Sequence, residues 1–275
     1  MIEIEHVRRN YGPTTAVADL NLTVKQGEVF AFLGPNGAGK TTTIKMIVGL
    51  LQPSAGAIRV CGHDVVRKAR ESSACIGYVP DEPHLYDKLT GRELLQFIGE
   101  MYGFPTGEVD RHIAREVERF QLGEFVDNLT ETYSHGMKQR TVFAAAMLHQ
   151  PRVLVVDEPM VGLDPHSIRL VKDLLMQQAA GGCTVFMSTH TLSVAEEVAD
   201  RIGVVHRGRL MFVGTVHELQ THFARPDRTL ERLYLDLVDA AEGRASSVEN
   251  GDEHQDLQDA DDAEATWSQS TETES

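Results

Sequence analysis

A glycine-rich stretch, GPNGAGKTT at residues 34–42, has the spacing of a loop that holds phosphate groups. Gly34, Gly39, Lys40 and Thr41 satisfy the pattern G-x-x-x-x-G-K-[ST]. The glycines let backbone N–H groups turn toward phosphate oxygens, and a helix that begins at the lysine points its positive end at them. The lysine can reach the β and γ phosphates, and the threonine hydroxyl can ligate Mg²⁺. These residues therefore predict a site for a nucleotide and magnesium.

Polar residues that follow two further apolar runs supply what such a phosphate site needs next. In VLVVDEP, Asp157 comes directly after four apolar residues, and we expect it to be the second partner of Mg²⁺. Glu158 is expected to act as general base for an attacking water. His190 follows the run TVFMS and so lies at the sheet edge where ligands bind in open α/β folds, where we expect it to contact the γ-phosphate. Because the sequence has no NKxD motif, ATP is a better candidate than GTP.

The elements that must position these residues alternate between β-branched runs and helical patterns, which predicts an α/β fold with parallel central strands. The first runs are joined by turns with no helix between them and predict a small antiparallel β region. Two helices are expected near the end, at 216–223 and 230–238. The predicted strands lie at residues 2–7, 29–33, 57–60, 76–79, 153–156, 184–188 and 202–206.

Residues 84–150 interrupt the alternation and predict an all-helical insertion. Thr90 and Glu93 have the spacing of a capping box in front of LLQFIGEMYGF. Apolar residues then recur at helical spacing from Val109 to Phe120. We therefore expect a helical subdomain inside the α/β domain.

The composition is that of a globular protein, with 41% hydrophobic and 24% charged residues among 275. A net charge of −15 argues against a protein that holds nucleic acid through general electrostatics. Much of this charge lies in residues 241–275, which contain eleven Asp or Glu and one Arg. Their few apolar side chains predict a disordered, solubilising tail.

The long apolar runs, such as VFAFL and VLVV, fall far short of the ~18 residues that a membrane helix requires. The N-terminal segment alternates apolar and charged residues and lacks the apolar region of a signal peptide, so we expect a cytoplasmic location. Cys61, Cys75 and Cys183 are scattered and form no CxxC pair, which argues against a disulfide framework or a zinc site.

With these motifs in order, residues 1–240 resemble the ATP-binding subunits of ABC transporters. GPNGAGKTT is similar to the family's Walker A motif, VLVVDEP to Walker B, VGLDP with Asp164 to the D-loop, and His190 to the H-loop histidine. The resemblance implies a P-loop NTPase (RecA-like) core with an N-terminal antiparallel β subdomain and an inserted all-helical subdomain. It also implies that Tyr11 stacks on adenine. The phosphate-binding residues that it implies are Gly34, Pro35, Asn36, Gly37, Ala38, Gly39, Lys40, Thr41 and Thr42.

The stretch YSHGMKQR at 133–140 allows three interpretations by itself: a nucleophile and base at Ser134 and His135, a basic anion patch, or a turn before a helix. The resemblance assigns it to the family's signature motif, which usually reads LSGGQ. Ser134 and Gly136, at the start of a helix, would then bind the γ-phosphate held by a second subunit. Two chains would enclose two ATP molecules, as a homodimer or a heterodimer.

Two features depart from the family pattern. In the signature, Tyr133, His135 and Met137 replace the usual Leu, Gly and Gln, and the histidine adds bulk and a titratable group near phosphate. Asp81, in IGYVPDEPHLYDKLT, stands where the family has the Q-loop glutamine. Asp81 can still accept from water or bind Mg²⁺, so it is a candidate metal ligand beside Asp157.

The resemblance implies an ATP-hydrolysing subunit on the cytoplasmic face of the cell membrane, with Lys40, Glu158 and His190 as catalytic residues. It would dimerise on ATP and drive a separate integral membrane permease, which would dock in a groove of the helical insertion. The variant signature is more similar to bacterial ABC-2-type exporters than to importers. The alternative is a soluble ABC ATPase in translation or repair, but such proteins carry two nucleotide domains or long coiled-coil insertions, which this sequence lacks. No nucleic-acid partner is expected.

Overall fold

The computed structural model describes residues 1–223 and 229–240. The first compact unit comprises Met1–Pro226, and a second begins at Asp227. In the second unit, residues 230–240 are helical, as predicted for 230–238. The acidic tail predicted at 241–275 lies outside the described residues, and the domain boundary at 240 stays a prediction. No helix in the described part of the chain is long and apolar enough to cross a membrane.

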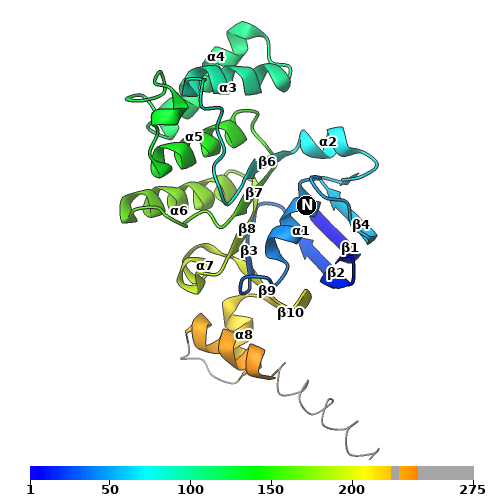
Figure 1. The fold of residues 1–275 in the computed structure, drawn as a ribbon. Helices are drawn as coiled ribbons and strands as arrows, with labels where there is room; N and C mark the ends of the chain where they lie inside the picture. The colour runs from blue at the N-terminus through cyan, green and yellow to red at the C-terminus, as the bar shows by residue number, and fades with distance from the viewer. Residues whose placement is uncertain (224–228, 241–275) are drawn as a thin grey trace, which may run out of the picture. The chain divides into compact units, whose positions relative to one another are not determined.

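A six-stranded sheet forms the centre of the first unit, with the strand order β10-β9-β3-β8-β7-β6 (Figure 1). β3 pairs in parallel with β8 and β9, and β7 pairs in parallel with β6 and β8, while β10 is antiparallel to β9. The carboxyl ends of the parallel strands therefore meet at one edge. The strands are β3 (Val29–Leu33), β6 (Ile76–Val79), β7 (Val153–Asp157), β8 (Thr184–Thr189), β9 (Arg201–His206) and β10 (Arg209–Gly214).

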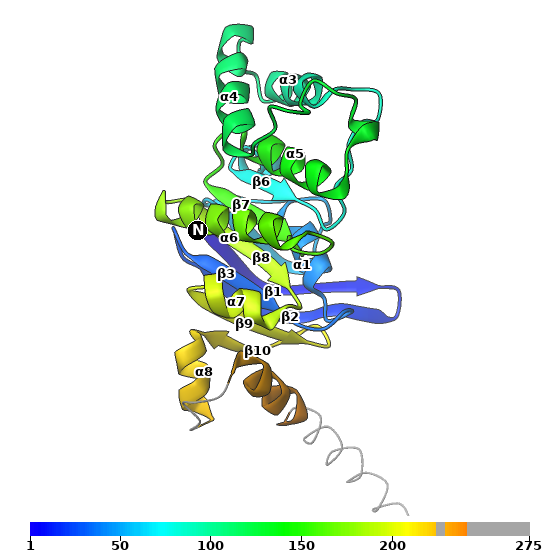
Figure 2. The ribbon, with the colours of Figure 1, turned by 90° about the vertical axis from the view of Figure 1, so that its left-hand side faces the viewer.

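Helices cover both faces of the middle strands, which is why these strands read as continuous apolar runs. β3, β7 and β8 consist of buried residues throughout. Figures 1 and 2 show α6 (Pro165–Ala180) and α7 (Leu192–Val198) on one face, and α1 (Lys40–Ile47) between the other face and a second sheet. The aromatic rings of Phe30 and Phe186 stack in this core with their centroids 5.7 Å apart.

The second sheet is antiparallel, with the order β2-β1-β4-β5, which confirms the predicted N-terminal β region. Its strands are β1 (Ile2–Tyr11), β2 (Thr14–Val24), β4 (Ala55–Val60) and β5 (His63–Asp64). β2 and β10 were not among the strands predicted from the sequence. In β2, buried residues such as Leu20, Leu22 and Val24 alternate with exposed polar ones, so it contains no continuous apolar run.

The predicted helical insertion is confirmed between β6 and β7. It contains α3 (Gly91–Met101), α4 (Thr106–Arg119), a 3₁₀ turn (Thr130–Thr132) and α5 (His135–Met147), and Figure 2 shows these helices beyond the β6 edge of the sheet. The capping box is present: Glu93 N donates to Thr90 Oγ1 at 3.2 Å, and Thr90 N donates to Glu93 Oε2 at 2.8 Å. Two short helices, α2 (Ala69–Ser73) and α8 (Val216–His222), complete the unit, the latter as predicted.

Candidate active site

The glycine-rich loop joins β3 to α1 at the carboxyl edge of the sheet, so all predicted phosphate residues at 34–42 lie together. Two of its glycines are required by close backbone approach. A Cβ on Gly34 would lie 2.4 Å from Val205 O, and one on Gly39 would lie 2.6 Å from Ala16 O. Gly39 also has a φ of 104°, which residues with side chains rarely adopt. The course of the loop therefore depends on the glycines of the sequence pattern.

Lys40 is buried at the start of α1, with 6% of its side chain exposed. Its ammonium group donates hydrogen bonds to Gly34 O at 2.8 Å and Pro35 O at 3.3 Å. It also forms an ion pair with Glu158 Oε1 at 3.2 Å. A buried cation is stable only when it is paired and hydrogen-bonded. The loop and the carboxylate thus hold the positive charge at the point where the pattern places phosphate.

Asp157 ends β7 and is completely buried. Ser188 Oγ donates to its Oδ1, while its Oδ2 has no hydrogen-bond partner. Burial raises the pKa of Asp157, although the hydrogen bond from Ser188 and the nearby hydroxyl of Thr41 oppose the shift. A buried carboxylate oxygen without a hydrogen-bond partner is destabilising, and a bound cation would stabilise it.

The residues present fit Mg²⁺ better than a metal held by protein alone. The described residues contain no group of three or more His, Cys, Asp or Glu side chains that could hold a metal ion. Mg²⁺ is usually bound by one or two carboxylates together with substrate phosphates and water. Asp157 with its orphaned oxygen and the nearby Thr41 hydroxyl match that kind of site.

Glu158 lies between Lys40 and His190. The Nδ1 atom of His190 is 2.9 Å from Glu158 Oε2, and the His190 backbone N–H donates to the same oxygen at 3.3 Å. Glu158 has a φ of 47°, a strained conformation for a residue other than glycine. Its backbone N–H donates to both the carbonyl and the hydroxyl oxygen of Ser188 at 3.2 Å. Glu158 is therefore in direct contact with both of the other side chains predicted as catalytic, Lys40 and His190.

Ser188 is the site residue that the sequence analysis missed. It contacts both acids of the Walker B motif, because Asp157 and Ser188 are register partners on adjacent parallel strands. The available signal was a polar residue within the apolar run TVFMS, two positions before His190. Strand neighbours, however, are set by tertiary structure.

Two other predicted residues, Tyr11 and Asp81, are exposed. Tyr11, at the end of β1, is 47% exposed, and the guanidinium of Arg9 lies 4.8 Å from its ring centroid. Asp81 is an exposed residue after β6. Its charge contributes to the raised pKa of Asp157, so it acts on the site through space. Adenine stacking by Tyr11 and metal ligation by Asp81 stay predictions.

The stretch at 133–140 forms the start of α5. Ser134 is the N-cap, and its Oγ accepts a hydrogen bond from Met137 N at 3.3 Å. A Cβ on Gly136 would have Ser167 Oγ at 3.7 Å as its nearest neighbour, so the helix end is open. None of the hydrogen bonds and ion pairs described for this stretch joins it to Lys40 or Glu158. The start of α5 is thus separate from Lys40 and Glu158 in the contacts described, and phosphate binding by Ser134 and Gly136 stays a prediction.

The unusual signature residues have partners of their own. Tyr133 OH donates to Phe125 O at 2.8 Å and accepts from Gly91 N at 3.2 Å. His135 Nε2 lies 3.2 Å from Val161 O. Because the imidazole contacts a backbone carbonyl and the Ser134 hydroxyl caps the helix, these contacts do not support a nucleophile and base.

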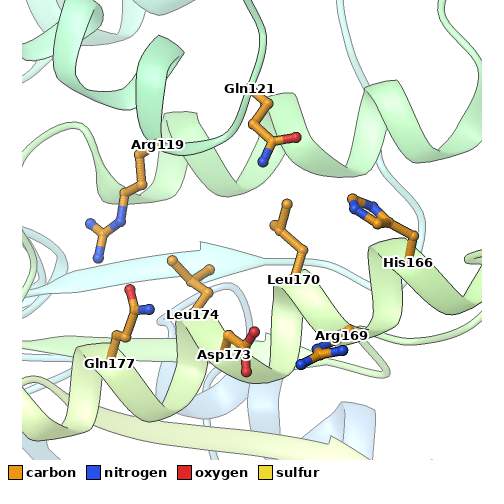
Figure 3. Close-up of a pocket in the computed structure, with 8 residues that line it drawn as sticks. All are labelled: Arg119, Gln121, His166, Arg169, Leu170, Asp173, Leu174 and Gln177. Atoms are coloured by element: carbon orange, nitrogen blue, oxygen red, sulfur yellow. The ribbon is translucent and has the colours of Figure 1, made fainter.

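A pocket of about 410 Å³ lies elsewhere, between the end of α4 and the exposed side of α6 (Figure 3). Figure 3 shows Arg119 and Gln121 facing side chains of α6 across it. None of the predicted site residues lines this pocket, and we assign it no part in the chemistry.

Comparisons with known proteins agree with this geometry. The sequence profile of the family described as "ABC transporter" matches residues 17–161. The chain is 39% identical over 219 residues to the linearmycin resistance ATP-binding protein of Bacillus subtilis (strain 168), which covers 80% of this chain and 70% of that protein. It is 35% identical over 222 residues to Nod factor export ATP-binding protein I of Ralstonia nicotianae, which covers 81% and 69%.

A solved structure described as the ATP binding subunit of an ABC transporter superposes on this fold with a TM-score of 0.81 and 32% sequence identity. The alignment covers 86% of this chain and 99% of that one. The likeness therefore includes the central sheet and the helical insertion as well as the phosphate loop.

Proposed function

Because this chain belongs to the ABC transporter family, as an ATP-binding subunit with ATPase activity, we propose that it energises export through a separate membrane permease. The observation that carries the proposal is the contact among Lys40, Glu158 and His190 beside the buried Asp157. Hydrolysis of ATP requires a phosphate-binding loop, a carboxylate that can bind a cation and a positioned general base, and Lys40, Asp157 and Glu158 belong to these three parts.

In this mechanism each side chain has one task. Lys40 binds the β and γ phosphates, and Glu158 accepts the proton of the attacking water. His190 orients the Glu158 carboxylate and contacts the γ-phosphate. Asp157 and Thr41 would hold Mg²⁺, which would neutralise phosphate charge. Phosphate oxygens compete with Glu158 for the Lys40 ammonium, so substrate binding frees the carboxylate to act as a base.

We propose that the second half of each site comes from another subunit, which is either an identical or a related chain. Support comes from α5, a helix of 13 residues whose capped N-terminus at Ser134 is exposed and separate from Lys40. ABC ATP-binding subunits dimerise, and a helix N-terminus is a ready anion site. Ser134 and Gly136 would bind the γ-phosphate of the ATP held by the other subunit's loop.

We propose that the permease docks in an apolar groove of about 640 Å³ beside the helical insertion. The groove contains large exposed apolar side chains, Leu50, Tyr86 and Met101, which are 63% exposed or more. Such a patch marks an interaction site. Its wall includes Pro80 and Tyr86, on either side of Asp81, so an occupant would contact the loop that acts electrostatically on Asp157. Docking on an integral membrane protein would hold the chain at the membrane, and we propose that it does so on the cytoplasmic face.

Export is favoured over import by the names of the two relatives, one a resistance protein and one an export protein. The soluble alternative, an ABC ATPase in translation or repair, has no such support. The permease would determine the transported substrate.

The ATPase assignment is tested with Glu158→Gln, which keeps the shape of the side chain but cannot accept a proton. We expect turnover to fall by about a thousandfold while ATP still binds, since loss of a general base costs about two to four orders of magnitude. Steady-state hydrolysis and equilibrium binding of ATP are the measurements. Wild-type turnover in the variant would remove Glu158 from the mechanism.

The docking proposal is tested with Met101→Lys, which places a charge in the groove near the end of α3, where a cation suits the helix. We expect about tenfold less integral membrane protein to co-purify from native membranes, because a buried apolar anchor contributes more than 1 kcal/mol to an interface. ATP hydrolysis by the isolated subunit should be unchanged. Met211→Lys, an exposed methionine on β10, is the matched control. Equal recovery with both variants would place the permease elsewhere.

A further inference from the structure

The histidine that replaces a signature glycine contacts the loop that follows the general base. His135 Nε2 lies 3.2 Å from Val161 O, and since a carbonyl accepts, the imidazole nitrogen carries the proton. The ring also lies against Gly162, where a Cβ would be 3.2 Å from His135 Cδ2. Gly162 has a φ of 74°, so both its conformation and the imidazole ring favour a residue without a side chain.

The contacted loop, residues 159–163, connects Glu158 to Asp164. Its internal hydrogen bonds are long: Val161 N donates to Glu158 O at 3.3 Å, and Leu163 N donates to Met160 O at 3.4 Å. Its far end is fixed, because Asp164 caps α6 by accepting from Ser167 N at 3.0 Å. At its near end Glu158 has the strained φ of 47°. A contact from outside the loop can therefore affect the position of the Glu158 side chain.

We propose that His135 is a positioning residue, which ties the start of α5 to the 159–163 loop of its own chain and thereby holds Glu158 in place for hydrolysis. The proposal rests on the proposed function, in which α5 binds the ATP of the other subunit. His135 then links the helix that senses one ATP to the base that acts on the other. A glycine at this position has no side chain with which to make the link.

Three variants separate the hydrogen bond from the bulk of the ring. His135→Ala removes both, His135→Phe keeps a ring without a donor, and His135→Gln restores an N–H at a similar distance from the backbone. His217→Ala, an exposed histidine on α8, is the control for the loss of an imidazole.

The first measurement is hydrogen exchange of the amides of residues 160–163 in the protein without nucleotide. We expect exchange to be about fivefold faster in the Ala and Phe variants, since a net hydrogen bond contributes on the order of 1 kcal/mol, and near wild-type exchange in the Gln variant. This readout does not depend on ATP hydrolysis, so it can fail or succeed independently of the proposed function.

The second measurement is the split between kcat and KM for ATP hydrolysis. We expect kcat to be about fivefold lower in the Ala and Phe variants with KM within about twofold of wild type, and recovery with Gln, because a misplaced base affects the transition state and not ATP binding. A raised KM with unchanged kcat would make His135 a phosphate contact and overturn the proposal. Wild-type exchange and kcat in His135→Phe would overturn it as well.

Discussion

We propose that phosphate binds at two places, the carboxyl edge of the central sheet and the N-terminus of α5, and these two places are built differently. At the sheet edge Asp157 is completely buried, and Lys40 and Glu158 are largely buried and paired. At the start of α5, Ser134 and His135 are exposed, and the partners described for their side chains are backbone groups. A buried charge is stable only when it is paired within the fold, whereas the exposed N-terminus of a helix is stable alone and can bind an anion held by another molecule. The difference is the one we expect between a catalytic centre within one chain and a contact that a second chain would complete.

Ser134→Ala tests whether the start of α5 and the sheet edge act as separate phosphate contacts. Its expected effect is larger than that of Asp157→Asn, described below. We expect ATP hydrolysis to fall about tenfold, since the variant removes a phosphate donor at the dimer contact, while ATP binding to a single subunit is unchanged. The variant should also lose about 1 kcal/mol of stability with the N-cap. Turnover, equilibrium ATP binding and ATP-dependent dimer formation are the measurements.

Thr215→Ala is the matched control, because the Thr215 hydroxyl caps α8 as the Ser134 hydroxyl caps α5, accepting from Glu218 N at 3.0 Å. It should lose similar stability and keep wild-type hydrolysis. If the two variants hydrolyse ATP equally well, α5 plays no part at the phosphate. If Ser134→Ala weakens ATP binding to single subunits, the two regions form one site within the chain.

The same comparison shows why part of the site was predictable. Lys40, Asp157 and His190 each follow an apolar run, and the carboxyl ends of parallel strands converge, so the sequence alone placed them together. The role of Ser188 was missed because it depends on which strands are neighbours. Tyr133 likewise binds Phe125 O and Gly91 N, contacts that bring together separate parts of the helical insertion and that no local pattern encodes.

The strands β2 and β10 were missed for a different reason, since they alternate or lie at an edge and bury only part of their residues. The central strands β3, β7 and β8 were predicted to within one residue, because burial on both faces leaves a strong signal in composition. Sequence thus predicts best the strands of this fold that are buried on both faces, and the residues predicted as catalytic lie just beyond the ends of those strands or on the loop that follows them.

Asp157→Asn tests the buried region at the sheet edge. We expect a smaller effect than for Ser134→Ala, and of opposite sign, because this variant should raise the stability of the fold. Burial raises the pKa of Asp157 above its ordinary 3.8, so the folded state binds this proton more tightly than the unfolded chain. The group's stabilising contribution is present below that value and is lost as the pH rises through the raised pKa. At neutral pH the buried carboxylate, with only one oxygen hydrogen-bonded, therefore destabilises the fold. Asparagine removes the charge and keeps an acceptor for the Ser188 hydroxyl.

We expect the Asp157→Asn variant to melt at a higher temperature than wild type at pH 7 without nucleotide or metal, by about 3 °C for each kcal/mol recovered. The advantage should shrink as the pH falls toward 4. It should also shrink with Mg²⁺ and ATP, because the metal then stabilises the wild-type carboxylate and not the amide. Thermal unfolding across pH, with and without Mg²⁺ and ATP, is the measurement. A variant that melts below wild type in the absence of ligands would mean that the fold, and not the metal, requires the charge of Asp157.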